Sequence, residues 1–333
     1  MNRRLPEEMR ETGKSRRPDS ALSRRTGWIL LGFIALMAAG IVIFGWQDAV
    51  AAAARLDTGG IGLLCALAGT HYLIRALRWH MMVRADGVRT GAIQNARHFF
   101  GGFAMTATPG RLGELIRLRW LGRETGRAPA SLLPIVFADR AIELASIVLL
   151  IVAMLLAAHL GSGAVWWLVA VAALLVWVAC RPDVMERLLV AGWRVSGRRR
   201  PRLAARMRGM IRSLHPFMHA RVLYPALAIG VFGWALEGVA FWLLLGWLGA
   251  PLSLAAAAAI FLVAVLSGAL SGLPGGLGGT EATSIALLML QGVPTETAIL
   301  ATAIIRITTL WFAVLIGFIV FPAAEMRSAA ASL

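Results

Sequence analysis

The stretch that decides the fold is GALSGLPGGLGGTE, residues 268–281, which lies inside an otherwise apolar region. A proline removes a backbone hydrogen-bond donor and each glycine weakens a helix by about 1 kcal/mol, so a continuous membrane helix does not have this sequence. We expect one half-helix to end here, the chain to turn between Pro274 and Gly279, and a second half-helix to begin near Thr280. Irregular backbone at membrane depth is tolerated only inside protein or beside a watery cavity, so this break is a candidate site.

An earlier stretch, GGFAMTATPGRLGE at residues 101–114, repeats the break. Its Pro-Gly-x-Leu-Gly pattern begins at Pro109, 165 residues before the matching pattern at Pro274. An offset of one residue more carries Arg140 onto Arg306. Because this offset is close to half the chain, we interpret the sequence as two copies of one unit.

The composition indicates the class of protein. The chain is 59% hydrophobic and 15% charged, and its mean hydropathy is +0.73, which is far from the values of a soluble domain. We therefore predict an all-α polytopic membrane protein. The net charge of +16 does not predict nucleic-acid binding, because the arginines fall between apolar runs, where the positive-inside rule expects them.

Apolar runs of spanning length predict about six full spans, and the two breaks predict two re-entrant half-helix hairpins. The spans are expected at residues 28–46, 59–77, 131–159, 164–180, 223–248 and 297–321, and the hairpins at residues 92–121 and 253–291. Eight spans are the alternative. Since three spans lie between the breaks, the hairpins should enter from opposite faces, which is an inverted repeat of the kind found in many transporters.

These elements divide the chain into five regions. We expect a basic cytoplasmic tail at residues 1–27, a first membrane half at 28–180, a basic cytoplasmic linker at 181–221, a second membrane half at 222–322 and a C-terminal tail at 323–333. The distribution of arginine places both termini on the cytoplasmic side. The run at 28–46 is long for a cleaved signal peptide, so we favour a retained span.

The breaks predict an anion site. A half-helix that begins within the membrane directs unpaired N–H groups and its positive dipole end at the break, glycines let a phosphate approach, and arginine matches phosphate geometry. The predicted substrate-binding residues at the breaks are Pro109, Gly110, Arg111, Gly113, Glu114, Arg117, Pro274, Gly275, Gly276, Gly278, Gly279 and Glu281. The alternative is that Pro-Gly only kinks the helices for packing.

Charged residues within apolar spans complete the predicted substrate site: Asp139, Arg140, Glu143 and Arg306. The alternative for the first three is a structural ion pair, since they lie within one helical turn of each other. Arg306 needs a partner, for which Glu281, Glu237 or a substrate phosphate is a candidate. Glu237 and Glu281 are the candidate proton-coupling groups, because burial opposes the charge of a carboxyl group.

We assign no binding role to the other polar residues of the apolar runs and the linker. Arg75 follows His71 by one turn near the end of its span, and we interpret it as a helix-end arginine that snorkels to the interface. His215 and His219 have helical spacing, but a proline intervenes and no third ligand is near. We therefore expect no metal site and no cofactor.

Four features together resemble the transmembrane region of lysylphosphatidylglycerol synthases, a family often called flippase-like. They are PGRLGE at 109–114 with Arg117, the Asp139-Arg140…Glu143 cluster, LPGGLGGTE at 273–281, and Arg306. The likeness runs from residue 28 to residue 321. It implies a bacterial or archaeal inner-membrane protein that translocates lipids between leaflets. The aminoacyl-transfer domain of the full-length synthases is absent from this chain, so we do not expect aminoacylation.

The leading hypothesis is an inner-membrane transporter that moves an anionic lipid or lipid-linked phosphate between leaflets. A second hypothesis is a membrane enzyme, or an accessory subunit of one, in glycolipid, hopanoid or cell-envelope lipid biosynthesis, with proteins of that pathway as partners. A scaffold for envelope assembly is a third. We expect a transporter rather than an enzyme, because clustered carboxylates for metal-assisted diphosphate chemistry are missing from the sequence.

Overall fold

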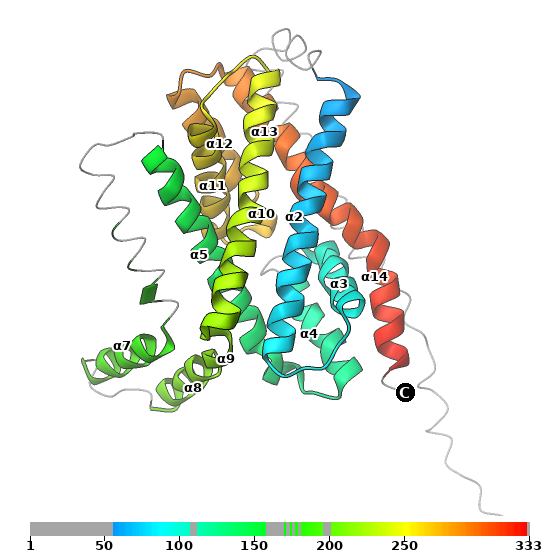
Figure 1. Cartoon of the computed structure of the whole chain (residues 1–333), viewed down its shortest axis with the longest axis vertical. Helices are drawn as coiled ribbons and strands as arrows, with labels where there is room; N and C mark the ends of the chain where they lie inside the picture. Colours follow the sequence, from blue (N-terminus) through cyan, green and yellow to red (C-terminus); the bar gives the residue numbers. More distant parts are fainter. Residues whose placement is uncertain are drawn as a thin grey trace, which may run out of the picture.

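The structure, a computed structural model, describes residues 56–106, 112–157, 181–195 and 201–331, together with a few positions between 170 and 178. Within these residues all regular structure is helical (Figure 1). Four helical segments of the described chain are long and apolar enough to cross a membrane: Thr58–Ala85, Pro129–Ala157, Ala220–Trp247 and Thr295–Ala330. The protein is therefore an all-helical, multi-pass membrane protein.

Two of the expected spans and the centre of the first break lie outside the described residues. These are the span at residues 28–46, nearly all of the span at 164–180, and residues 107–111 of the break.

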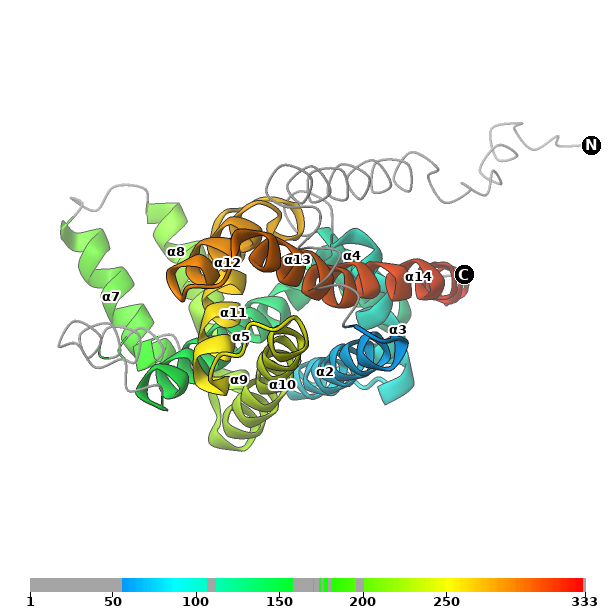
Figure 2. The same ribbon diagram turned by 90° about the horizontal axis from the view of Figure 1, so that it is seen from above.

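Helices α2 (Thr58–Ala85) and α10 (Ala220–Trp247) lie side by side along one side of the bundle (Figures 1 and 2). The α2 helix begins at Asp57, whose side chain accepts a hydrogen bond of 2.6 Å from the backbone N–H of Gly60. Glycines of α10 let the helices approach closely, because a Cβ atom at Gly233 would lie 3.2 Å from Nδ1 of His71. This contact brings polar residues of α2 and α10 together.

Helix α5 (Leu133–Ala157) follows a short 3₁₀ turn, η4 (Pro129–Leu132), and packs against α10. Gly230 of α10 lies so close to Ser146 of α5 that a Cβ atom at this glycine would overlap the serine side chain. The α5 helix is the third wall of the bundle and carries its acidic residues toward α2.

Two pairs of shorter helices lie at opposite ends of the bundle (Figure 1). One pair is α3 (Ala92–Gly101) and α4 (Leu112–Thr125), with the turn η2 (Gly102–Met105) between them. The other is α11 (Leu254–Leu270) and α12 (Gly279–Leu290), joined through η5 (Pro274–Gly276). The predicted interruption between residues 270 and 279 is confirmed, since α12 begins at Gly279.

The last long segment is interrupted in its interior. Helix α13 (Thr295–Arg306) passes into a π-helical turn, η6 (Ile307–Trp311), and then into α14 (Phe312–Ala330). π-Helical turns are rare and occur frequently at functional sites. This one begins directly after Arg306.

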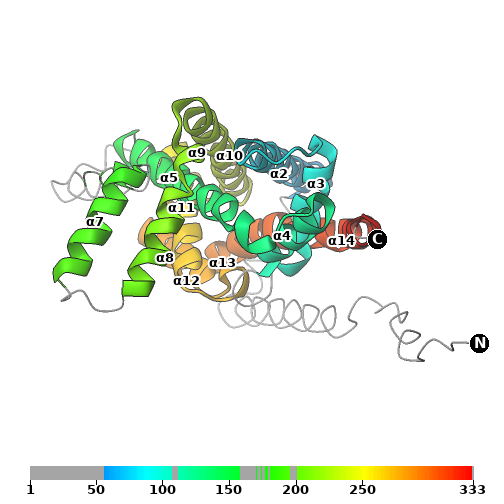
Figure 3. The ribbon, with the colours of Figure 1, turned by 90° about the horizontal axis from the view of Figure 1, so that it is seen from below.

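The arginine-rich linker forms α7 (Pro182–Val195), α8 (Pro201–Arg212) and the single turn α9 (His215–Met218). Seen from below, α7 and α8 lie side by side, away from α14 (Figure 3). They lie at the same end of the bundle as α3 and α4 (Figure 1).

Two large apolar clusters and a small third one around Trp311 fill the described bundle. The first includes Leu64, Phe241 and Leu262, and the second includes Trp79 and Phe99. Polar and charged side chains lie between these clusters, where they line a cavity.

Candidate functional site

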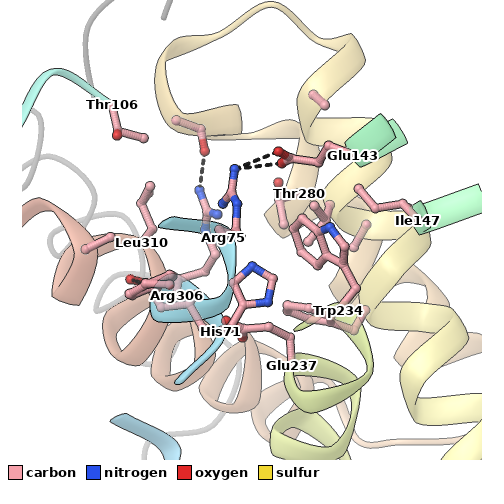
Figure 4. Close-up of a pocket in the computed structure, with 18 of the residues that line it drawn as sticks. His71, Arg75, Thr106, Glu143, Ile147, Trp234, Glu237, Thr280, Arg306 and Leu310 are labelled. Carbon is pink, nitrogen blue, oxygen red and sulfur yellow. Dashed lines mark hydrogen bonds and ion pairs between the residues drawn. The ribbon is translucent and has the colours of Figure 1, made fainter. Parts of the chain in front are cut away.

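A cavity of about 420 Å³ lies where both halves of the chain meet (Figure 4). Its walls come from α2, η2, α4 and α5 of the first half and from α10 to α14, η5 and η6 of the second. Four arginines from four different helices line it: Arg75, Arg117, Arg140 and Arg306. This concentration of guanidinium groups at one hollow favours an anionic occupant.

Glu143 of α5 lies at the centre of the first-half charge cluster. It accepts hydrogen bonds of 2.8 and 2.9 Å from Arg75 Nη2 and one of 3.1 Å from Arg140 Nη1. Arg78 donates to Glu143 Oε2 at 2.8 Å and, through Nε, to Asp139 Oδ1 at 2.7 Å. Arg78 is 1% exposed, so this ion-pair network ties α2 to α5 in the interior.

The interpretation of Arg75 as a snorkelling arginine is wrong. Its side chain is 14% exposed, lines the cavity and pairs with Glu143. Arg75 lies near the end of an apolar run, which suggested a place at the membrane–water interface. Helix α2 continues to Ala85, however, and keeps Arg75 inside the bundle. The acid that holds it lies on another helix, which sequence spacing does not reveal.

Arg306 organises the second-half break. Its Nε donates to Glu281 Oε1 at 2.6 Å and its Nη2 donates to the carbonyl oxygen of Gly275 at 2.7 Å. The other carboxylate oxygen of Glu281 accepts the N–H of Gly278 at 2.7 Å, which caps the start of α12. Of the partners considered for Arg306, Glu281 is therefore the one present, and Glu237 is not.

Backbone conformation explains why the break needs glycine. Gly275, Gly276 and Gly278 have φ values of 62°, 70° and 83°, in the left-handed region that other residues rarely adopt. Gly268 of α11 lies against Gly276 and Thr280, and a Cβ atom there would overlap the threonine hydroxyl. The glycines therefore form a tight turn that presents the Gly275 carbonyl to Arg306.

Glu237 lies deep in α10 and faces the cavity beside His71 and Trp234 (Figure 4). It is 2% exposed, and its Oε2 has no hydrogen-bond partner among the described residues. His71 donates from Nδ1 to the carbonyl oxygen of Gly233 at 2.5 Å, which fixes its ring toward α10. Glu237 thus differs from Glu143 and Glu281, which both pair with arginine.

Arg117 of α4 lies in an aromatic environment. Its guanidinium carbon is 4.3 Å from the centroid of Phe99 and 5.7 Å from those of Trp79 and Phe103. The residue is 4% exposed. Cation–π contacts stabilise such a buried cation, so the rings hold Arg117 at the cavity wall.

The structure brings part of the predicted site together. Arg117, Arg140, Glu143, Gly275 and Arg306 line the cavity, as does the predicted coupling residue Glu237. Asp139 and Glu281 are not among the lining residues, but Asp139 accepts a hydrogen bond from Arg78 and Glu281 accepts one from Arg306. Pro274 belongs to the second break, and Gly276, Gly278 and Gly279 form it without lining the cavity.

Predicted residues of the first break are described only in part. Pro109, Gly110 and Arg111 lie outside the described residues. Gly113 and Glu114 lie in the first turn of α4, and the structure describes their backbone only.

Sequence reasoning did not single out several residues of the cavity wall: His71, Tyr72, Trp234, Thr280, Ser284, Thr302 and Thr309. A signal was present in part, because Thr280 and Ser284 lie one helical turn apart in an apolar segment. Thr302 donates to the Ser284 hydroxyl at 3.1 Å, and the Tyr72 hydroxyl donates to the Thr309 carbonyl at 2.7 Å. Within the described chain, no group of three or more His, Cys, Asp or Glu side chains is placed to hold a metal ion.

Comparison with known proteins places this architecture in a family. A protein of Methanothermobacter thermautotrophicus named a UPF0104 membrane protein is 26% identical over 323 residues, which cover 88% of this chain and 94% of the relative. A second UPF0104 membrane protein of the same organism is 30% identical over 118 residues, or 35% of each chain. Residues 28–317, most of the chain, match the lysylphosphatidylglycerol synthase transmembrane region. The protein belongs to the lysylphosphatidylglycerol synthase transmembrane-region family.

Proposed function

We propose that this protein is an inner-membrane lipid transporter that moves an anionic lipid, or a lipid-linked phosphate, between leaflets. The observation that carries the proposal is the cavity that α2, α4, α5 and α13 line with arginine, at the place where both halves of the chain meet. Guanidinium groups match the geometry of phosphate oxygens and bind them with two parallel donors.

Exposed apolar residues border the cavity. Two of its lining residues, Leu144 of α5 and Leu270 of α11, are 42% and 78% exposed. We propose that a lipid headgroup enters at this apolar edge of the cavity while its acyl chains stay in the bilayer. Burial of the charged headgroup in an arginine-lined hollow lowers the cost of carrying it past the hydrocarbon.

The lengths of the shorter helices support two re-entrant hairpins. Helix α11 has 17 residues and α12 has 12, which correspond to about 25 Å and about 18 Å against a hydrocarbon thickness of about 30 Å. Helices α3 and α4, with 10 and 14 residues, are also short. Because the two pairs lie at opposite ends of the bundle, they fit an inverted repeat that opens the cavity to each leaflet in turn (Figure 1).

Charge supports the orientation. The arginine-rich α7 and α8 lie at the same end as α3 and α4, and basic loops face the cytoplasm (Figure 1). In this orientation α3–α4 enters from the cytoplasmic side, α11–α12 enters from the outer side, and the C-terminal end of α14 is cytoplasmic.

Reconstitution tests the proposal. Purified protein in vesicles that contain fluorescent phosphatidylglycerol should exchange that lipid between leaflets without changing its mass. Arg140→Gln should slow the exchange by about tenfold or more, since one lost charged contact is worth about 1.4 kcal/mol or more. Arg89→Gln, at an exposed loop position outside the cavity, is the matched control and should keep the wild-type rate.

Two outcomes would contradict the proposal. Folded protein that moves no phosphatidylglycerol, or that moves it equally well without Arg140, removes the role of the arginines. A lipid product of altered mass, detected by mass spectrometry, favours the enzyme hypothesis.

A further inference from the structure

The cavity contains a carboxyl group that the arginine network leaves unused. Glu143 and Glu237 are the acids that line the cavity among the described residues, and Glu143 accepts hydrogen bonds from three arginines. Glu237 is 2% exposed, and its Oε2 has no hydrogen-bond partner in the described part of the chain. An isolated buried carboxylate costs several kcal/mol, whereas a protonated carboxyl does not carry that cost.

Arginines surround Glu237, but their hydrogen bonds go mainly to other acids. Charged and titratable groups face the cavity from three helices packed against α10: His71, Tyr72 and Arg75 from α2, Arg140 and Glu143 from α5, and Arg306 from α13. Helix α11 contributes no titratable residue. Arg75 donates to Glu143 and Arg306 donates to Glu281, so their strongest contacts go to other acids. The charge state of Glu237 therefore depends on what else occupies the cavity.

We propose that Glu237 is a proton-binding site, and that it takes up a proton when an anionic headgroup enters the cavity. This inference rests on the proposed function, because the headgroup is the anion concerned. In the empty cavity the nearby guanidinium groups offset part of the cost of burying the carboxylate, so the group can ionise as the pH rises. An anion bound to those groups cancels their field and repels the carboxylate, so one proton moves from water onto the Glu237 oxygen and no other bond changes.

The same geometry excludes the other two acids as the proton carrier. Glu281 accepts from Arg306 with one oxygen and from the Gly278 N–H with the other, and both contacts favour the ionised form. Glu143 accepts hydrogen bonds from the guanidinium groups of Arg75, Arg78 and Arg140, which also favour the ionised form. Of the two coupling candidates found in the sequence, Glu237 is the one able to change its charge without breaking a structural contact.

Linkage makes the proposal measurable. If anion and proton bind together, the affinity for the anion must fall as the pH rises, by up to about tenfold per pH unit for one linked proton. We would titrate the full chain in detergent with a short-chain phosphatidylglycerol by calorimetry, from about pH 5 to about pH 9. The phosphodiester of this probe stays ionised over that range, so the slope reports on the protein.

Three variants define the result. Glu237→Gln imitates the protonated state and should bind the probe with an affinity that no longer changes with pH. Glu296→Gln, an acid in the first turn of α13 and outside the cavity, is the matched control and should keep the wild-type slope. His71→Gln should also keep that slope, because the imidazole is not the linked group.

The outcomes separate this inference from the proposed function. An unchanged slope in Glu237→Gln, a slope lost in His71→Gln instead, or wild-type binding that is independent of pH overturns the proton site and leaves lipid transport intact. If the wild-type protein binds no probe, the anionic-lipid function fails. Infrared spectroscopy of the empty protein then tests separately whether Glu237 binds a proton. A carbonyl band of a protonated carboxyl that disappears with rising pH, and that is missing in Glu237→Gln, supports the proton site, whereas its absence from the wild type at every pH from about 5 to about 9 overturns it.

Discussion

The two halves of the protein use arginine in different ways. In the first half, Arg78 joins two long helices, since it pairs with Asp139 and Glu143 across the α2–α5 contact. In the second half, Arg306 holds a broken helix in shape, since it binds Glu281 and a backbone carbonyl of the break. One network fixes how helices pack and the other fixes a turn, although both place guanidinium groups at the same cavity.

In each half, arginines that hold the fold together also line the cavity: Arg75 and Arg140 in the first half and Arg306 in the second. Arginines that satisfy acids or carbonyls with one edge of the guanidinium group still present donors to the cavity with another. The alternatives weighed for the sequence, a structural ion pair or a substrate site, are therefore not exclusive. Substitutions in each network should show which one contributes more to the stability of the bundle.

The largest effect is expected for Arg78→Leu. This change leaves Asp139, which is 2% exposed, without the guanidinium that it accepts from in the described structure. Loss of one partner of a buried pair costs about 3–5 kcal/mol. Thermal unfolding in detergent should show a large fall in midpoint, and Arg78→Leu combined with Asp139→Leu should recover part of it. A double variant no more stable than the single one would mean that the ion pair is not the cause.

The second effect is expected for Arg306→Lys. An ammonium group keeps the charge but cannot donate to Glu281 and to the Gly275 carbonyl with the fixed fork of arginine, so we expect a loss of about 1–3 kcal/mol. The same unfolding measurement applies, with Arg327→Lys at an exposed position of α14 as the control. If lysine lowers the unfolding midpoint no more at position 306 than at position 327, the break does not depend on the two guanidinium donors of Arg306.

A third test concerns the close packing of the second break. Gly268→Ala places a methyl group against the Thr280 hydroxyl and 3.0 Å from the Gly276 carbonyl oxygen, and such overpacking costs about 1–3 kcal/mol. Gly62→Ala in α2 meets nothing within 4 Å and should raise stability by about 0.5–1 kcal/mol. Opposite shifts in the unfolding midpoint are expected, and shifts of equal sign would show that the break is loosely packed.

The smallest effect is expected at the surface, for Glu186→Gln. Hydrogen bonding to Arg212 holds the pKa of Glu186 below its ordinary value, and the charge of Arg208 adds to this. A lowered pKa in the folded state gives a contribution that is present above the unfolded pKa and is lost as the pH falls through the folded one. Because the pair lies in water, the unfolding midpoint at neutral pH should not change measurably, and a clear fall would show that α7 and α8 are coupled to the bundle.

Much of the architecture could be predicted from local chemistry. Proline and clustered glycine forbid a continuous helix at Pro274, and the structure confirms α12 from Gly279 onward. Apolar length predicted the long helices, although α2 and α14 extend beyond the expected spans because charged side chains at their ends reach packed partners or water. Glu325, for example, lies in the part of α14 beyond the apolar run and accepts a hydrogen bond of 2.7 Å from the Trp120 indole.

The pairing of charges could not be predicted in the same way. Asp139 and Glu143 were expected to neutralise an arginine, and sequence spacing offered Arg140, whereas the structure adds Arg75 and Arg78 from a helix more than 60 residues earlier. Sequence proximity reports neighbours on one helix only. Which helix lies opposite depends on packing, here on the glycines of α10 that draw α2 close.

The sequence by itself determined that this chain is a membrane protein, at which residues a helix is interrupted, and which buried charges need partners. Hydropathy, proline and glycine determine these features because they act locally. Only the tertiary structure decided that arginines of four helices meet at one cavity, that Glu281 rather than Glu237 holds Arg306, and that Glu237 is left to face the hollow. Partner choice is a matter of distance between side chains from different helices, and that distance exists only once the bundle has formed.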